Sequence, residues 1–434
     1  MKDNISRKNL FEDFKQLYAK ELKENLLPFW ESRCLDTIHG GYYNCFTNDG
    51  RTLVSKDKYT WSQGRFVWIW AKLAMLKSDI FSDEDRRRFL SHAKLGIDFL
   101  RQHALLAPND WRCVFLNDEA GNPKFPEGQT VLNGSIYADC FVILAFSKYA
   151  LAADDPVCYT FAKKLYLSAM DQLEAGTFHT LPYPLSQQYR AHGIPMIFDD
   201  VSKELYYAAL HFAPEDAESI KQRMENFVSD ILTHFVDSED RLHEIISSKD
   251  QSFLQNLLGQ HLNPGHTLED TWFILDAAKI LGRADWEKQA ARLAKRALSL
   301  GWDPEYGGLY HFCGVDGGEP IGSITGVESE PMLQQTLSGW SDKLWWVHSE
   351  ALYATLRLFA MTDDTAFLEW HNRVLSYVQN RHLNPDRSVG EWIQILKRDG
   401  TPQQKVTALP VKDPYHIIRN VALLIELCEA QITK

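Results

Sequence analysis

The chain has 434 residues, of which 45% are hydrophobic and 24% are charged, a balance typical of globular proteins with a large core. The formal net charge is −12 without any run of Lys or Arg, so we expect neither a nucleic-acid partner nor a membrane partner. Seven cysteines without regular spacing and a polar N-terminal segment without an apolar signal sequence indicate reduced thiols and a cytoplasmic location. No apolar run seen in the sequence is as long as a membrane span.

Hydrophobic periodicity predicts twelve helices that fall into six pairs. The second helix of each pair begins near residue 62, 134, 201, 266, 341 or 413, at intervals of about 65 to 75 residues, which indicates an internal repeat. These second helices are the more apolar members, whereas the first helices are amphipathic. In chain order the predicted helices span 7–25, 62–77, 85–105, 134–152, 156–175, 201–213, 216–234, 266–281, 284–300, 341–359, 364–380 and 413–430.

Long connections precede the second helix of each pair, and most of them read as strand–turn–strand. Examples are GGYYNCFTNDGRTL, WRCVFLNDEAGNPKF, GGLYHFCGVDGGEP and GEWIQILKRDGTP. Six buried helices ringed by six amphipathic ones predict an all-α fold, an (α/α)6 barrel, that forms a single domain over residues 1–434. The long connections, with their short β-hairpins, then gather at the end of the barrel where the inner helices begin.

Polar and aromatic side chains are concentrated at these predicted helix starts, where they would line a cavity. In LNPGHTLED, residues that interrupt a helix stand directly before His266 and Glu269, which share one helix face. His416 and Arg419 repeat this spacing on the last inner helix. The other candidates at or near these starts are Tyr59, Arg65, Tyr137, Asp139, His192, Glu244, Asp270, Trp345, Trp346, His348, Glu350 and Tyr415.

Two histidines, His266 and His416, are expected to face one pocket because the fourth and sixth inner helices flank the fifth. Histidine can both accept and donate a proton near neutral pH. Two opposed histidines therefore suit removal of a proton alpha to a carbonyl and its return from the other face, through an enediolate and without metal or cofactor. His311 lies on a predicted hairpin outside this set, and we expect its replacement to cost little.

The sequence lacks the common metal-binding, nucleotide-binding and hydrolase motifs, and some of the candidate residues also have a purely structural interpretation. The sequence has no HExxH, GxGxxG, GxxxxGK[ST] or GxSxG motif, so no metal or nucleotide cofactor is indicated. One histidine at a helix start is usually a cap or a surface residue, but four at equivalent places favour a site. Arg65 could equally pair with a surface acid. Trp345 and Trp346 are core residues by default, because adjacent helical residues point in different directions.

The motifs LNPGHTLEDTWFIL, LGWDPEYGGLYHF, DKLWWVHSEAL and GEWIQILKRDG…PYHIIR resemble the N-acylglucosamine 2-epimerase family, as does HGGYYNCFTNDGR…YTWSQGRFVWIW. The resemblance runs from about residue 20 to the end. It implies an (α/α)6 barrel and chemistry at C2 of a sugar. The family includes N-acylglucosamine, cellobiose and mannose 2-epimerases and aldose–ketose isomerases.

The resemblance also implies roles for individual residues. His266 and His416 correspond to the catalytic pair, and Arg65 would bind near the reactive oxygens. His192 matches a site histidine of the isomerase and cellobiose branches, whereas the N-acylglucosamine branch has an apolar residue there. The expected substrate-binding residues are Arg65, Tyr59, His192, Glu244, Glu269, Trp345, Trp346, Glu350, His348 and Arg419.

The leading hypothesis is a cofactor-independent sugar 2-epimerase that acts on an N-acyl hexosamine or on a free aldose such as mannose or glucose. An aldose–ketose isomerase using the same site is the main alternative. A glycoside hydrolase would instead need a carboxylate pair, for which Glu269, Glu350 and Asp139 are candidates. A non-catalytic binding protein is the fourth hypothesis. The expected partners are a small sugar and, by the resemblance, a second copy of the chain in a homodimer.

Overall fold

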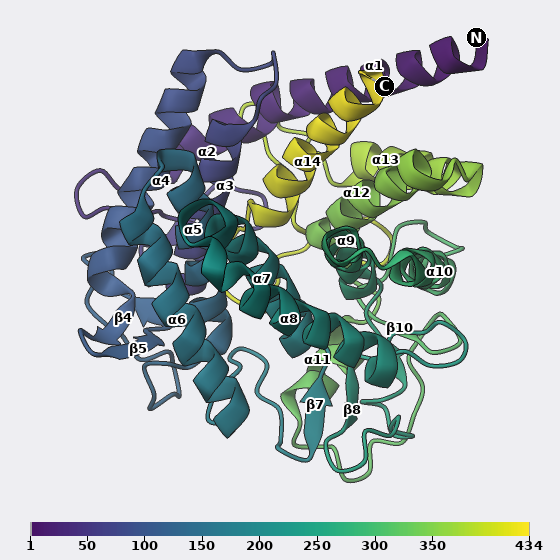
Figure 1. The fold of residues 1–434 in the computed structure, drawn as a ribbon. Coiled ribbons are helices and arrows are strands. Elements are labelled where there is room, and N and C mark those ends of the chain that lie inside the picture. Colours follow the sequence, from purple (N-terminus) through teal and green to yellow (C-terminus); the bar gives the residue numbers. More distant parts are fainter. Residues whose placement is uncertain (1, 434) are drawn as a thin grey trace.

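Six inner helices form a closed ring, and six outer helical segments surround it (Figure 1). The computed structural model describes residues 2–433. Each inner helix contacts the next one along the chain, and the last contacts the first. The predicted (α/α)6 barrel is therefore confirmed. The inner helices are α3 (Thr60–Met75), α5 (Ile136–Ala153), α7 (Gly193–Phe212), α9 (Pro264–Leu281), α12 (Trp345–Thr362) and α14 (Tyr415–Ile432).

One outer segment packs against each inner helix. The first is longer than the predicted 7–25, because α1 (Lys2–Glu21) continues through a π-helical turn, η1 (Leu22–Leu26), into α2 (Leu27–Arg33). Helix α1 packs against α14, so the start and the end of the chain close the barrel together. The others are α4 (Asp83–His103), α6 (Pro156–Ala175), α8 (Pro214–Asp230) with its π-helical extension η2 (Ile231–Phe235), α10 (Ala284–Gly301) and α13 (Thr365–Arg381).

The repeat is less regular than the sequence pattern predicted. The inner helices begin at 60, 136, 193, 264, 345 and 415, so the intervals range from 57 residues (136 to 193) to 81 residues (264 to 345). Helix α7 begins well before the expected residue 201, because the buried polar residues Asp199 and Asp200 interrupt the apolar pattern of its first turns without interrupting the helix. The long fifth connection contains a short helix that was not predicted, α11 (Pro331–Gly339).

Most strands pair across repeats rather than within one connection, which corrects the hairpin prediction. The first quoted segment forms the expected hairpin, between β1 (Cys45–Phe46) and β2 (Leu53–Ser55), and the second and fourth fold back through single antiparallel bridges, Asn117–Pro123 and Leu396–Pro402. In four other pairs, a strand directly before or near the start of an inner helix joins a strand in the following connection. These pairs are β3 (Lys58–Tyr59) with β6 (Leu116–Asn117), β7 (Tyr189–Ala191) with β8 (Ile245–Ser247), β9 (His261–Leu262) with β10 (Cys313–Gly314) and β11 (Lys343–Leu344) with β12 (Ile395–Leu396).

The sixth pair joins β4 (Leu105–Ala107) to β5 (Asp110–Cys113) at a tight turn. Strands of two to four residues are too short to be stable as isolated hairpins. Pairing with the neighbouring repeat satisfies their backbone groups and ties consecutive helix pairs together at the end of the barrel where the inner helices begin.

Helix α5 corrects the expectation that no segment is long and apolar enough to cross a membrane. Its 18 residues meet that test by length and composition, and 72% of them are buried in the structure. As an inner helix it packs against α3 on one side and α7 on the other, with α6 outside. The barrel therefore accounts for the apolar composition of α5. All seven cysteines are buried and free, as expected for reduced thiols.

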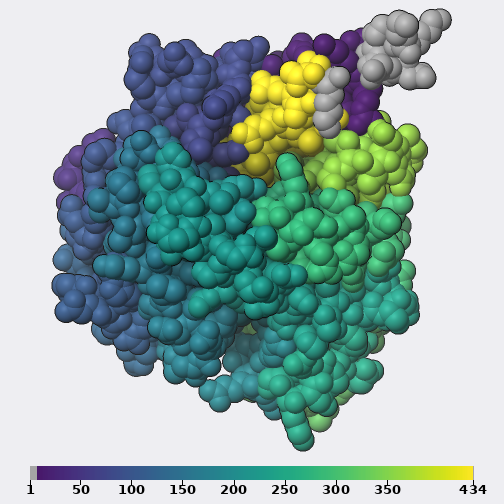
Figure 2. Space-filling model, in the orientation of Figure 1, coloured from purple at the N-terminus to yellow at the C-terminus, as the bar shows by residue number. Residues whose placement is uncertain are grey.

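The main hydrophobic cluster extends from Phe11 of α1 to Cys428 of α14 and includes residues of every inner helix. Figure 2 shows consecutive parts of the chain as adjacent sectors of the surface, with the yellow C-terminal helix beside the purple N-terminal one. The ring geometry brings the starts of six helices, far apart in the sequence, to one end of the molecule.

Candidate active site

A cavity of about 480 Å³ lies where the inner helices begin. Its wall consists of the first turns of these helices and of the connections between them. Eight of the predicted site residues line it: Arg65, Glu244, His266, Glu269, Trp345, Trp346, His416 and Arg419. Tyr137 and Tyr415, two further candidates at the helix starts, also line it.

The start of α9 is built to present His266 to this cavity. The side-chain oxygen of Asn263 accepts a hydrogen bond from the His266 backbone N–H (3.2 Å), and Pro264 occupies the first helical position. A Cβ atom on Gly265 would lie 2.5 Å from the Trp346 ring, so only glycine fits there. The unusual Asn-Pro-Gly-His sequence thus caps the helix, starts it and allows the indole to lie close to it.

Trp346 packs against both histidines. Its ring centroid is 5.2 Å from that of His266 and 5.5 Å from that of His416, so the two imidazoles lie within about 11 Å of each other. Trp345 points elsewhere: its indole N–H donates to the backbone oxygen of Asp413 (3.2 Å), and only 9% of the residue is exposed. Both tryptophans therefore line the cavity, but the Trp345 indole N–H is used in a backbone hydrogen bond, whereas the Trp346 ring contacts the two histidines.

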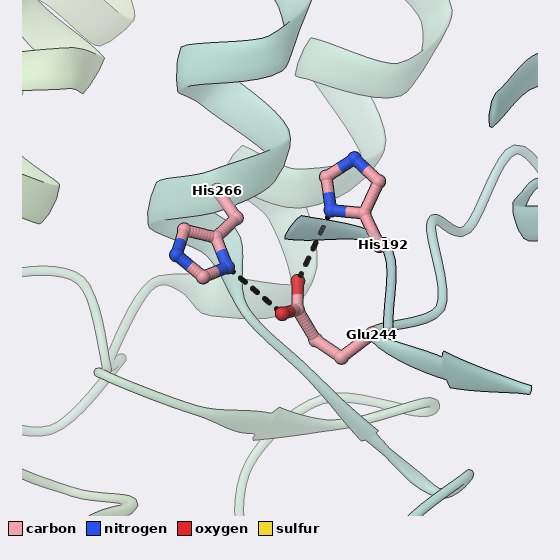
Figure 3. A group of neighbouring side chains, drawn as sticks. All are labelled: His192, Glu244 and His266. Atoms are coloured by element: carbon pink, nitrogen blue, oxygen red, sulfur yellow. Dashed lines mark hydrogen bonds and ion pairs between the residues drawn. The ribbon is translucent and has the colours of Figure 1, made fainter. Parts of the chain in front are cut away.

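Nδ1 of His266 forms a 2.8 Å hydrogen bond with the carboxylate of Glu244, shown in Figure 3. Nδ1 of His192 lies 3.8 Å from the other Glu244 oxygen, and Nε2 of His192 bonds to Asp270 at 2.9 Å. The four side chains form a chain from the buried Asp270 to the cavity. Among them only His266 is substantially exposed, with 31% of its side chain accessible.

The carboxylates in this chain favour charged imidazoles. Burial by itself lowers the pKa of His266, but the Glu244 carboxylate outweighs burial, and the pKa is raised above its ordinary value. Burial likewise opposes the charge on His192, yet Asp270 and Glu244 raise its pKa to about 9. Although burial alone would raise the pKa of Glu244, the two histidines hold it well below its usual range.

His416 has a different environment. Its Nδ1 forms a 2.7 Å hydrogen bond with Glu350, and the Arg419 guanidinium lies 2.5 Å from both Glu350 and Glu269. The second Glu350 oxygen accepts the indole N–H of Trp272 (2.9 Å). Burial lowers the pKa of His416 to about 3, and the positive charges of Arg65 and Arg419 act in the same direction, against the carboxylate of Glu269.

Arg65 forms an ion pair with Asp413, at the end of the segment that leads into α14. The guanidinium also lies over three aromatic rings, with its carbon 4.2 Å from the ring centroid of Phe141 and about 5 Å from those of Trp61 and Tyr415. These cation–π contacts keep the guanidinium at the cavity wall. The open alternative that Arg65 pairs with a surface acid is thereby excluded, because the Asp413 side chain is only 7% exposed.

Four predicted site residues do not line the cavity. His192 and Glu350 lie behind the wall and contact it through the hydrogen bonds just described. Tyr59 belongs to β3, and its ring packs edge-on against Phe115. The predicted contact of Tyr59 with substrate finds no support in this geometry, because Tyr59 is absent from the residues that line the cavity.

His348 is fully buried on the outer side of α12. Its Nε2 accepts the backbone N–H of Leu309 (2.9 Å), its Nδ1 donates to the Leu344 oxygen (2.7 Å), and its ring stacks on Tyr377. Burial lowers its pKa well below the ordinary value, in keeping with a neutral ring. The hydrogen bonds occupy both nitrogens, so the predicted contact of His348 with substrate is replaced by a role in joining the helix to a loop.

The exclusion of His311 from the site is wrong. His311 lines the cavity, stacks on Phe312 and lies edge-on to Trp346, with centroids 6.3 Å apart. Burial and the neighbouring His266 lower its pKa to about 3. The sequence placed it in a hairpin, but the strand there pairs with β9 and brings it over the start of α9. Further lining residues that the sequence reading missed are Asp200, Gln335, Gln394, Gln404, Lys405 and Asp413.

Clusters of histidine and carboxylate side chains can also bind metal ions. Within residues 2–433, three groups have candidate ligand atoms within 4.8 Å of one another, and two are the His266 and His416 groups described above. In both, the histidine Nδ1 already bonds to a carboxylate. In the third, Asp36 is paired with the Lys58 ammonium at 2.6 Å. Internal hydrogen bonds and ion pairs thus account for the three clusters.

Comparison with known proteins agrees with this geometry. The family model described as N-acylglucosamine 2-epimerase (GlcNAc 2-epimerase) matches residues 41–420. Bovine N-acylglucosamine 2-epimerase is 29% identical over 95% of this chain and 91% of its own length, and a cellobiose 2-epimerase of Ruminococcus albus is 24% identical over 92% and 94%. The solved cellobiose 2-epimerase of Bacillus thermoamylovorans superposes with a TM-score of 0.75 at 19% identity, covering 96% of this chain and 99% of that one.

The family match covers most of the chain, and the aligned relatives extend over nearly its full length. The range matched by the family model includes both histidines of the cavity, His266 and His416, and the arginine at its wall, Arg65. The chain belongs to the N-acylglucosamine 2-epimerase family.

Proposed function

We propose that this protein is a sugar 2-epimerase, an isomerase that inverts C2 of an N-acyl hexosamine or a free aldose with His266 and His416 as its two bases. The observation that carries the proposal is the placement of two imidazoles in one cavity, both against the Trp346 ring and each with its Nδ1 held by a carboxylate. In the part of the chain that the structure describes, neither Nε2 has a hydrogen-bond partner, so both nitrogens are available to a substrate.

The chemistry follows from this arrangement. The aldehyde of an open-chain sugar acidifies the proton on C2. One neutral histidine removes that proton through Nε2, and the electron pair moves into an enediolate or its acylamino equivalent. The other histidine, as an imidazolium, delivers its proton to the opposite face of C2, and the stereocentre is inverted. General acid–base catalysis of this kind contributes typically about 10²–10⁴-fold for each group.

Arg65 is suited to stabilise the intermediate. Its guanidinium is held at the cavity wall by Asp413 and by aromatic rings before any substrate arrives. A fixed positive donor of this type stabilises negative charge that develops on a substrate oxygen without a reorganisation cost. Trp346, which contacts both bases and lines the cavity, offers an apolar face on which the C–H groups of a sugar can stack.

An N-acyl hexosamine is the first substrate class to test. Relatives named N-acylglucosamine 2-epimerase are 26 to 29% identical to this chain, compared with 21 to 24% for those named cellobiose 2-epimerase. The histidine at position 192, which departs from the N-acylglucosamine branch, does not argue against this class, because His192 is fully buried behind Glu244. A free aldose stays the alternative.

Proton NMR in heavy water gives the direct test. The purified protein is incubated separately with N-acetylglucosamine, N-acetylmannosamine, glucose, mannose and cellobiose. We expect the C2 proton signal of one of these sugars to disappear while the anomeric signals of its 2-epimer grow. A ketose product would assign the same residues to an aldose–ketose isomerase. An unchanged spectrum with all five sugars would contradict the proposal.

The carboxylates of the cavity are poorly arranged for the glycoside hydrolase alternative. Glu269 and Glu350 both accept from the same Arg419 nitrogen at 2.5 Å, so they converge on one cation rather than flank a glycosidic bond. Asp139 is buried, accepts the backbone N–H of Cys113 (3.2 Å) and does not line the cavity. A cytoplasmic location and a homodimer stay predictions, which cell fractionation and light scattering can test.

A further inference from the structure

The two cavity histidines are held by carboxylates that are themselves paired very differently. Glu350 accepts three hydrogen bonds, from His416, from Trp272 and from the Arg419 guanidinium, and is completely buried. A permanent cation, which Glu350 shares with Glu269, thus offsets the negative charge behind His416. Because arginine does not lose its proton in proteins, this compensation persists at every working pH.

Glu244 has no such cation. Among residues 2–433, no Lys or Arg forms an ion pair with it, and its ionic partners are His266 and His192. Its Oε2 bonds to His266, whereas its Oε1 has no hydrogen-bond partner and lies 3.8 Å from Nδ1 of His192. Figure 3 shows the carboxylate between the two rings. The side chain is 7% exposed, so water screens the charge little.

Asp270 completes this arrangement from behind. Its Oδ2 bonds to Nε2 of His192 at 2.9 Å, and both side chains are fully buried. Asp270 therefore balances a positive charge on His192, and the negative charge of Glu244 is left to act on His266. With both carboxylates ionised, this chain of two carboxylates and two imidazoles is electrically neutral when both imidazoles are protonated.

We propose that Glu244 is a positioning residue, which together with His192 and Asp270 keeps His266 as the imidazolium in the resting protein, while the Arg419-paired Glu350 leaves His416 as the neutral base. This inference rests on the proposed function for its catalytic meaning. The other titratable or charged groups facing His266 are Glu269 on its own helix and His311 from the opposite loop. The raised pKa of His266 and the lowered pKa of His416 agree with this assignment.

The proton inventory follows directly. In the first half-reaction, the C2 proton moves to Nε2 of His416 and its electron pair enters the enediolate. In the second, the N–H bond of the His266 imidazolium breaks and a new C2–H bond forms on the other face. Product release leaves His416 protonated and His266 neutral. Exchange with water restores the resting form, so no oxidant, reductant or other co-reactant is required.

The test uses the pH dependence of kcat/KM for Glu244→Gln. Loss of the proton from His266 inactivates the resting form, so the alkaline limb of the profile reports the His266 pKa. An opposite charge at this distance shifts a pKa by about one to three units, so we expect the alkaline limb of the variant to move to lower pH by that amount. Glu239→Gln, on the same connection but with a 55% exposed side chain, is the matched control and should keep the parental profile.

Conservative replacement separates charge from shape. Glu244→Asp keeps the carboxylate, and we expect its alkaline limb to stay within about half a pH unit of the parent even if kcat falls, since the sign and approximate place of the charge are retained. If Asp and Gln move the limb equally, or if Gln leaves it in place, the assignment of Glu244 is overturned.

A measurement without catalysis keeps this inference separate from the proposed function. The imidazole signals of 13C- and 15N-labelled histidine are followed from pH 5 to 10, with His266→Gln identifying the His266 signal. A charged His266 at pH 7 supports the proposal, and a neutral one overturns it, even if no sugar is turned over. If Glu244→Gln does not fold, this titration of the parent protein still decides the question.

Discussion

The two histidines of the cavity are chemically identical side chains whose surroundings make them unequal. His266 is held by Glu244 and retains 31% side-chain exposure, whereas His416 retains 8% and is held by a carboxylate already paired with Arg419. Sequence spacing identified both residues but offered no means of distinguishing them, because Glu244 and Glu350 approach from segments 22 and 66 residues away.

Replacing either base should abolish epimerisation while leaving the barrel intact. For His266→Ala and His416→Ala we expect kcat to fall by at least about 10²–10⁴-fold, the contribution of one positioned acid or base. Turnover followed by NMR, with circular dichroism to verify folding, measures the effect. His211→Ala, whose side chain is 55% exposed, is the control. Near-parental activity in either cavity variant would contradict the two-base assignment.

Arg65 provides a separate test of the intermediate. Removal of one fixed oxyanion donor typically costs about 10²–10³-fold in kcat, and we expect Arg65→Ala to lose at least that much. The rate of C2 proton exchange with solvent should fall in parallel, since the same enediolate is required. An Arg65→Ala protein that exchanges the C2 proton at the parental rate would show that Arg65 does not stabilise the enediolate.

At the scale of the element, the residues that start α9 depend both on local helix capping and on a contact with Trp346 of α12. Asn263 and Pro264 are ordinary helix-start residues and were readable from the sequence as such. The need for glycine at 265 was not, because its cause is Trp346, about eighty positions later in the chain. The helix start thereby leaves room for the aromatic ring that contacts both bases.

A methyl group at this helix start should disturb Trp346. We expect Gly265→Ala to lower the free energy of unfolding by about 1–3 kcal/mol, the usual cost of overpacking, and to raise KM because the indole must move. Urea unfolding and steady-state kinetics measure the two effects. Asn263→Ala is the comparison, expected to cost about 1 kcal/mol as a lost helix cap but to leave the indole in place. Parental stability and KM in Gly265→Ala would argue against this close contact.

At the scale of the whole molecule, each of the six inner helices contributes a charged residue to ion pairs that extend from the cavity wall into the barrel. The pairs are Lys72–Glu426 (2.6 Å), Lys148–Glu204 (2.6 Å), Lys203–Asp200 (2.5 Å), Lys203–Asp276 (3.3 Å) and Arg357–Asp276 (2.7 Å). Except for Asp200, which also lines the cavity, the paired residues lie in the later turns of the helices, whereas the cavity lies at the starts. The barrel interior is therefore partly polar.

Removal of one cation from this network should be costly. Lys203→Met leaves Asp200 and Asp276 without their shared partner, and breaking a buried pair in this way typically costs about 3–5 kcal/mol. Urea unfolding at pH 7 measures the change, with exposed Lys94→Met as control. A loss below 1 kcal/mol would mean that the remaining network compensates fully.

The free energy of unfolding is expected to fall at both acidic and alkaline pH, for two different groups. Burial opposes ionisation of Asp276, but Arg357 and Lys203 lower its pKa, so its stabilising contribution is present above the unfolded value near 4 and is lost as the pH falls further. Conversely, the carboxylates overcome burial and raise the pKa of Lys203, whose contribution is present below about pH 10 and is lost only at higher pH. Lys203→Met should weaken the alkaline dependence in thermal unfolding scans, because one of the groups that titrate there is removed.

The amino-acid sequence by itself determined the number and order of the paired helices, the inner set and the end of the barrel at which chemistry-bearing residues gather. These features follow from helical periodicity and from residue types at helix starts, which are local properties. Only the tertiary structure decided which side chains meet. Strand pairing across repeats brought His311 into the cavity, the closed ring placed Glu350 behind His416, and burial turned His348 into a structural residue. Such contacts depend on distance, burial and charge balance between segments far apart in the chain, which no local pattern records.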